Sequence, residues 1–167
     1  MERHEWVRLH TRRVLAPFLE VLARSHGWNR IFLISPWMSE ISEPGLPTVA
    51  QLATRLRHDR ATAYIVTRPP IESWHEAVLG ILERSRRANI AIVPELHTKL
   101  YCASTAQAEF ALFGSANFTQ KSLSNIELGV FVNGIGGGRR LVRDLIYEAA
   151  QIYRSPTRTV RCTHRVI

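Results

Sequence analysis

The first half of the chain alternates between apolar residues at helical spacing and short, continuous apolar runs. The helical spacing predicts helices over residues 4–25, 49–57 and 74–87. The continuous runs predict buried strands over residues 31–34, 63–66 and 90–93. Because a helix precedes each of these strands, the pattern indicates a parallel sheet with helices across its faces. The first helix carries arginines along one side, which also occurs in helices that lie on membrane surfaces.

The second half of the chain has a different pattern. Residues 99–103 and 109–113 predict two strands joined by a short polar link, which suits an antiparallel hairpin. A turn opening a short helix (114–123), a strand (127–132), a glycine-rich turn (134–138), a helix (140–153) and a basic tail of about a dozen residues follow. The sequence therefore predicts an α/β fold with a mixed, mostly parallel central sheet, in a single domain over residues 1–167.

The composition is that of a globular protein with an excess of positive charge. Hydrophobic residues make up 46% of the 167 residues, and the formal net charge is +8. Such a charge favours a polyanionic partner, either nucleic acid or an anionic membrane surface. The alternative explanation is that the charge serves solubility alone.

The sequence shows no sign of secretion, membrane insertion or metal binding. Charged residues occupy the N-terminal positions where a signal peptide needs an apolar run, and no segment reaches the roughly 18 apolar residues of a membrane span. Cys102 and Cys162 form neither a disulfide framework nor a metal cluster. We therefore expect a cytoplasmic protein with no membrane association, no metal and no cofactor.

Candidate chemistry is concentrated around His97 and Lys99, which flank one residue at the start of a predicted strand. Alternation along a strand places residues i and i+2 on the same face, so both side chains are expected in one pocket. Histidine exchanges protons near neutral pH and can attack phosphorus, whereas lysine neutralises phosphate charge. Only one other lysine, Lys121, occurs in the chain.

A second group of polar residues follows in Gly114-Ser115-Ala116-Asn117, where a predicted strand leads into a helix. Ser115, Asn117 and free backbone N–H groups are suited to holding a phosphate at this turn. Glu127, on the next predicted strand, is a candidate to orient His97.

Two further residues follow the first two predicted strands and are candidates for the rim of a cleft. Trp37 is suited to stacking a base, and Arg68 to holding a flanking phosphate. The alternatives are loop packing for Trp37 and a solvated side chain for Arg68.

Together, His97-x-Lys99, Gly114-Ser115-x-Asn117 and Glu127 resemble the signature of the phospholipase D superfamily, H-x-K-x4-D followed by G-S-x-N. The resemblance implies a three-layer α/β/α fold and metal-independent phosphodiester hydrolysis through a phosphohistidine. One departure stands out, because Ser104 occupies the position of the family's aspartate and a longer spacer follows. The resemblance implies that this aspartate mostly supports the structure, so we expect a rebuilt hairpin.

The family's reaction uses two histidines, whereas this chain carries a single motif. The resemblance therefore implies a homodimer that brings His97 of each subunit face to face, with the two imidazoles titrating as a coupled pair. Three functions remain open: a nuclease acting on DNA or RNA, a lipid phosphodiesterase, and a catalytically weak nucleic-acid-binding module. The nuclease or the module could belong to a larger defence or DNA-processing system.

Overall fold

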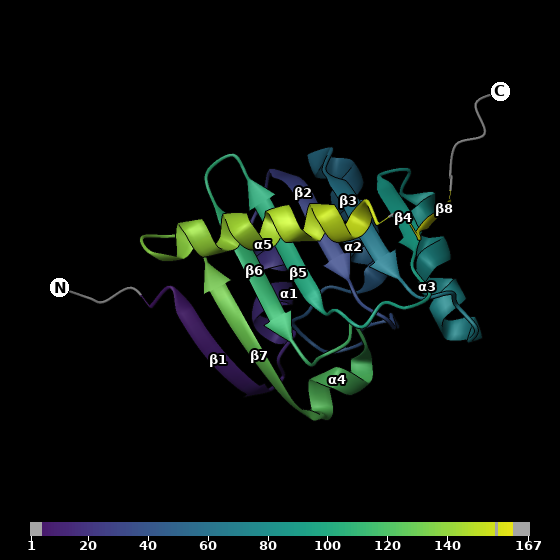
Figure 1. Cartoon of the computed structure of the whole chain (residues 1–167), viewed down its shortest axis with the longest axis horizontal. Coiled ribbons are helices and arrows are strands. Elements are labelled where there is room, and N and C mark those ends of the chain that lie inside the picture. The colour runs from purple at the N-terminus through teal and green to yellow at the C-terminus, as the bar shows by residue number, and fades with distance from the viewer. Residues whose placement is uncertain (1–4, 156, 162–167) are drawn as a thin grey trace.

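In the computed structural model, which describes residues 5–155 and 157–161, one eight-stranded sheet runs through the molecule (Figure 1). The strands are β1 (Val7–Arg12), β2 (Trp28–Ile34), β3 (Thr62–Thr67), β4 (Ala88–Ile92), β5 (Leu100–Thr105), β6 (Glu109–Gly114), β7 (Ile126–Asn133) and β8 (Thr159–Arg161). The helices are α1 (Ala16–Arg24), α2 (Val49–Asp59), α3 (Ser73–Arg84), α4 (Gln120–Ser124) and α5 (Gly138–Tyr153). The strand order is β1-β7-β6-β5-β2-β3-β4-β8.

Helices cover both faces of the sheet, so the fold has the expected three layers. Within β2, Ile31 and Leu33 belong to one apolar cluster together with buried residues of α1, α2 and α3. Phe32 and Ile34 point to the opposite face and belong to a second cluster with α5. This alternation places α5 alone across one face, as Figure 1 shows. The prediction of an α/β/α architecture with a mixed sheet is confirmed.

Parallel pairing is less extensive than predicted. The β2–β3 and β3–β4 pairs are parallel, whereas the other five pairs in the described chain are antiparallel. The expectation of a mostly parallel sheet was wrong, because β5, β6 and β7 follow one another as adjacent antiparallel strands. The edge strands β1 and β8 also join the sheet in antiparallel orientation.

The N-terminal region forms a strand followed by a short helix, whereas the sequence predicted one helix over residues 4–25. Pro17 lies in the first turn of α1, where its missing N–H costs nothing, but it would break the interior of a longer helix. Arg13 has a left-handed φ of 51° and turns the chain between β1 and α1. The alternating side chains of β1 pair with β7 instead.

The predicted basic tail is partly structured. Residues 159–161 form β8 against β4, and Arg161 makes ion pairs with Glu76 and Glu83 of α3. Residues 156 and 162–167 of that tail lie outside the described residues.

The change of strand direction between β2 and β5 brings distant segments to one edge of the sheet. This edge is formed by the ends of strands and not by the outermost strands β1 and β8. Ile34 at the end of β2 pairs with Leu100 at the start of β5, and Gly114 at the end of β6 pairs with Gly129 near the start of β7. The ends of β2, β3 and β6 therefore meet the starts of β5 and β7 at this edge, beside α4 at the bottom of Figure 1.

Candidate active site

His97 and Lys99 lie at this edge, in the loop that leads into β5. The His97 side chain is exposed, while the preceding Leu96 is buried and anchors the loop. Lys99 Nζ donates to the His97 carbonyl oxygen at 2.9 Å. The structure therefore ties the Lys99 ammonium to the backbone of His97 and leaves the imidazole exposed.

Arg68, which follows the end of β3, contacts Leu96 and His97 of this loop. Its Nε donates to the Leu96 carbonyl oxygen at 2.7 Å, and its Nη2 lies 2.7 Å from Nε2 and 3.2 Å from Nδ1 of His97. The guanidinium also lies over the Trp37 ring, 5.9 Å from its centroid. The two residues expected at the rim thus contact each other, and Arg68 reaches the imidazole itself.

The Gly114-Ser115 turn is held to β7 by backbone and side-chain hydrogen bonds. Ser115 N donates to the Leu128 carbonyl oxygen at 2.8 Å, and Leu128 N donates to Ser115 Oγ at 3.0 Å. The Ser115 hydroxyl in turn donates to the Glu127 carboxylate. Gly114 N donates to the Lys99 carbonyl oxygen at 3.3 Å, which links the two halves of the motif. Within this chain, Glu127 is therefore held by Ser115, and His97 is contacted by Arg68.

Two buried residues that the sequence analysis did not single out fix the Ala116–Phe118 loop. Tyr101 donates its hydroxyl to the Ala116 carbonyl oxygen at 2.8 Å, and Phe118 N donates to Ser35 Oγ at 2.9 Å. Ser35 Oγ donates onward to the Trp37 carbonyl oxygen at 2.7 Å. Burial raises the pKa of the Tyr101 phenol far above its ordinary value, and the nearby Glu127 carboxylate adds to the shift. Tyr101 therefore remains protonated and able to donate.

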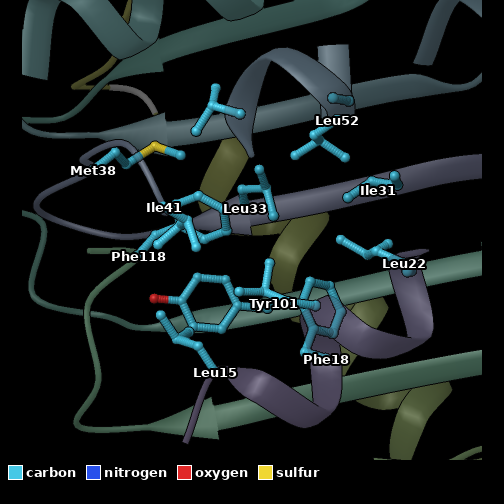
Figure 2. Packing of buried hydrophobic residues seen from close by; sticks show 14 of the residues in the cluster. Leu15, Phe18, Leu22, Ile31, Leu33, Met38, Ile41, Leu52, Tyr101 and Phe118 are labelled. Carbon is cyan, nitrogen blue, oxygen red and sulfur yellow. The ribbon is translucent and has the colours of Figure 1, made fainter. Parts of the chain in front are cut away.

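The Tyr101 ring also connects the site to the apolar core. Figure 2 shows the ring beside Phe18 and Phe118, with its hydroxyl directed away from Phe18. The sequence signal for this role was weak, because a tyrosine in an apolar strand is an ordinary core residue. Its hydroxyl needs a partner when buried, and here that partner is the motif loop itself.

A pocket of about 720 Å³ opens next to these residues and is lined in part by Trp37, Asn117 and Glu127. Asn117 Oδ1 is buried and has no hydrogen-bond partner among the described residues. An unpaired buried amide oxygen is costly, so this atom is available to a ligand. His97 and Lys99 lie outside the pocket lining, and Arg68 links His97 to the lining residue Trp37.

Among residues 5–155 and 157–161, no group of three or more histidine, cysteine or carboxylate side chains could hold a metal ion. In the same part of the chain, no helix is long and apolar enough to cross a membrane. Cys102 is buried in β5, and burial raises the pKa of its thiol.

No protein-family model and no curated protein matches the sequence. Solved structures do resemble the fold. A phospholipase D family member, Nuc from Salmonella typhimurium, superposes with a TM-score of 0.66 over 93% of this chain and 95% of its own, at 13% identity. The chain has the phospholipase D fold. NucT from Helicobacter pylori superposes with a TM-score of 0.61 over 89% of this chain and 96% of its own, at 10% identity.

Larger proteins contain the same phospholipase D fold as a part. The archaeal chromatin protein TrmBL2 superposes with a TM-score of 0.56 over 92% of this chain and 54% of its own, at 12% identity. Phosphatidylserine synthase from Haemophilus influenzae superposes with a TM-score of 0.57 over 96% of this chain and 40% of its own, at 9% identity. The fold is thus shared by proteins with different named roles. The function of this chain therefore has to be argued from its site and not from its fold.

Within this phospholipase D fold, the departure at Ser104 lies away from the candidate site. Ser104 occupies the far end of β5 from His97, where it pairs with Glu109 across the hairpin. Its hydroxyl donates to the Arg30 carbonyl oxygen at 3.5 Å. Thr105 Oγ1 accepts from Gln107 N and Ala108 N and closes the hairpin turn.

Proposed function

We propose that the protein is a phosphodiesterase that cleaves nucleic acid without a metal, with His97 as the nucleophile. The observation that carries this proposal is the exposed His97 imidazole, 2.7 Å from Nη2 of Arg68, on a loop where Lys99 Nζ donates to the His97 carbonyl oxygen. An arginine that contacts the imidazole and a lysine two residues along the chain suit a phosphate anion and its transition state. The fold supports the proposal, because it is shared with a phospholipase D family member.

The proposed reaction proceeds in two displacements. A His97 ring nitrogen attacks phosphorus, a P–N bond forms, and the P–O bond to the leaving oxygen breaks while a second histidine donates its proton to that oxygen. That histidine then takes a proton from water, the hydroxide attacks phosphorus, and the P–N bond breaks. We assign Lys99, Arg68 and the amide nitrogen of Asn117 to stabilising the charge on the non-bridging oxygens.

The second histidine is proposed to be His97 of a partner subunit. The described chain carries one His-x-Lys motif, and none of the residues that line the pocket is a histidine. An isologous dimer with its two-fold axis at the open edge of the sheet would supply the missing proton donor. The proposal requires a dimer at the concentrations where the protein is active.

Charge favours nucleic acid over lipid as the substrate. A groove of about 640 Å³ between β1 and α1 is lined by Arg8, Arg12, Arg13 and Arg24. Arg12 pairs with Ile126 at the start of β7, so this basic groove begins at the same sheet edge as the candidate site. A cluster of guanidiniums suits a chain of phosphates rather than a single headgroup.

The experiment is a cleavage assay with excess chelator on single-stranded DNA, duplex DNA, RNA and phosphatidylcholine vesicles. We expect cleavage of at least one nucleic acid and loss of that cleavage, with binding retained, in His97→Ala. Cleavage of the vesicles alone would favour the lipid phosphodiesterase. Binding of nucleic acid without cleavage of any substrate would favour the binding module, for which the DNA binding named for TrmBL2 is a precedent.

A further inference from the structure

The pocket beside the candidate active site has an apolar wall that the proposed chemistry does not use. Trp37, Ile71 and Trp74 form this wall, and we call the space the tryptophan pocket. Ile71 is 77% exposed and Trp74 is 43% exposed, although both are large apolar side chains. Exposed apolar groups gathered at a polar site mark a place where a ligand binds.

The Trp74 ring is held in a fixed orientation by a buried histidine. Its ring lies nearly parallel to the His75 imidazole, with centroids 5.7 Å apart and an interplanar angle of 21°. His75 Nε2 lies 2.9 Å from Thr67 Oγ1, and Thr67 donates its own proton to the Pro36 carbonyl oxygen. His75 Nε2 must therefore carry the proton that it donates to Thr67. The Trp74 ring thus packs against His75 on one side, while the side chain as a whole remains 43% exposed.

Trp37 is fixed by the same histidine. Its ring meets the His75 imidazole edge to face, with centroids 5.9 Å apart, while Arg68 lies over the ring. Trp37 and Trp74 therefore both pack against His75, and Trp37 also contacts the guanidinium that reaches His97. A ligand stacked on this wall lies next to the proposed position of the scissile phosphate.

The opposite wall, contributed by α4 and its flanking residues, is polar but carries little net charge. Asn125 and Gln120 supply amide groups, and Lys121 supplies an ammonium. Glu72 and Glu127 also line the pocket, so carboxylates outnumber ammonium groups in its lining. This balance disfavours a phosphate inside the pocket and suits a flat, neutral group with hydrogen-bonding edges.

We propose that the tryptophan pocket takes an unpaired nucleobase next to the scissile phosphate, stacked on Trp74. This inference rests on the proposed function and narrows its substrate to single-stranded or locally unpaired nucleic acid, because a paired base has both faces and its hydrogen-bonding edge occupied. A base stacked on an aromatic side chain in this way is bound with little dependence on its identity.

The test uses a short end-labelled oligothymidylate and the same strand with one abasic residue at its centre. In wild type, we expect cleavage at one of the two phosphates flanking the abasic residue to fall about tenfold or more, while cleavage at distant phosphates serves as the internal standard. In Trp74→Ala this positional loss disappears, and in Trp74→Phe it returns. The matched control is Tyr147→Ala, which removes an exposed aromatic side chain of α5 outside the pocket.

Equal cleavage on both sides of the abasic residue in wild type would overturn the nucleobase proposal and leave the nuclease proposal intact. If no strand is cleaved, the affinities of His97→Ala for the two strands are compared. Weaker binding of the abasic strand would support the nucleobase proposal even though the proposed function has failed. Conversion of Trp74→Ala to a monomer would show that a second subunit fills the pocket, and would also overturn the proposal.

Discussion

Nη2 of Arg68 lies 2.7 Å from Nε2 of His97, and both imidazole nitrogens are within 3.2 Å of it. A guanidinium can only donate, so Arg68 competes for a ring nitrogen of His97. In the proposed reaction, a ring nitrogen of His97 attacks phosphorus. Arg68 then has to release the imidazole when a phosphate draws the guanidinium away.

This relationship predicts that Arg68→Ala lowers kcat/KM by roughly 100-fold, because the transition state loses one cation and the imidazole loses its orientation. Arg68→Lys should restore only part of the lost kcat/KM. The planar guanidinium of arginine contacts Leu96, His97 and Trp37 at once, whereas a compact ammonium cannot. Steady-state kinetics on the three proteins checks this. Unchanged kcat/KM in Arg68→Ala would show that the contact has no part in the reaction.

Removing the buried hydroxyl of Ser35 should loosen the motif loop. Ser35→Ala leaves Phe118 N–H buried without its acceptor, and we expect a loss of about 1–3 kcal/mol in the free energy of unfolding together with reduced cleavage. Urea unfolding monitored by fluorescence measures the first effect. Ser104→Ala is the matched control, because its hydroxyl bond is long and lies far from His97, so activity should change little.

The close approach of β6 to β7 makes Gly114 irreplaceable. A Cβ at this position would lie 2.1 Å from the Leu128 carbonyl oxygen, so Gly114→Ala must push the strands apart and displace Ser115. We expect it to destabilise the fold by about 1–3 kcal/mol and to abolish cleavage. In Gly80→Ala, the new Cβ meets only the Arg84 side chain at 3.5 Å, so this helix substitution should stabilise the protein by about 0.5–1 kcal/mol. Thermal denaturation of both variants distinguishes the two effects.

Burial lowers the pKa of His75 below its ordinary value of 6.5. The unfolded chain therefore binds a proton at a higher pH than the folded chain does, and stability is lost as the pH falls below about 6.5 until the folded-state pKa is reached. We expect His75→Gln to lose less stability than wild type between about pH 7.5 and about pH 5. Urea midpoints at the two pH values provide the comparison. An identical pH dependence in both proteins would contradict the burial of a neutral imidazole.

Binding to nucleic acid should depend steeply on salt. A strand that contacts about four phosphates loses roughly 100-fold in affinity between about 50 and about 200 mM salt. Replacing Arg8 and Arg12 with glutamine should reduce this slope if the basic groove holds the backbone. Fluorescence anisotropy on the cleavage-deficient His97→Ala protein gives both slopes, and a flat titration would argue against a nucleic-acid substrate.

Local patterns in the sequence predicted much of the secondary structure. Continuous apolar runs located β2, β3 and β4, because strands covered by helices on both faces must be apolar throughout. The helix predicted over residues 4–25 was wrong in its first part, because the residues of edge strand β1 also fit helical spacing, whereas Pro17 confines the helix to α1. The parallel direction of β2, β3 and β4 and the antiparallel hairpin of β5 and β6 were predicted. The strand order and the antiparallel β2–β5 pair could not be predicted, because they depend on pairings between residues far apart in the chain.

The candidate site was predictable where its residues belong to a contiguous motif. Two short segments contain its residue types, which are typical of phosphate binding and attack: His97 and Lys99 in one, Ser115 and Asn117 in the other. Ser35 and Tyr101 were missed because a buried serine and a core tyrosine look ordinary until their hydroxyls are seen to hold the motif loop.

The two lysines of the sequence have a practical consequence. Lys99 lies in the site and Lys121 lines the tryptophan pocket, so every lysine ε-amine in the protein reports on the same region. An acylating reagent followed by mass spectrometry is therefore a footprinting assay for ligand occupancy, and it needs neither an engineered label nor any change to the chain.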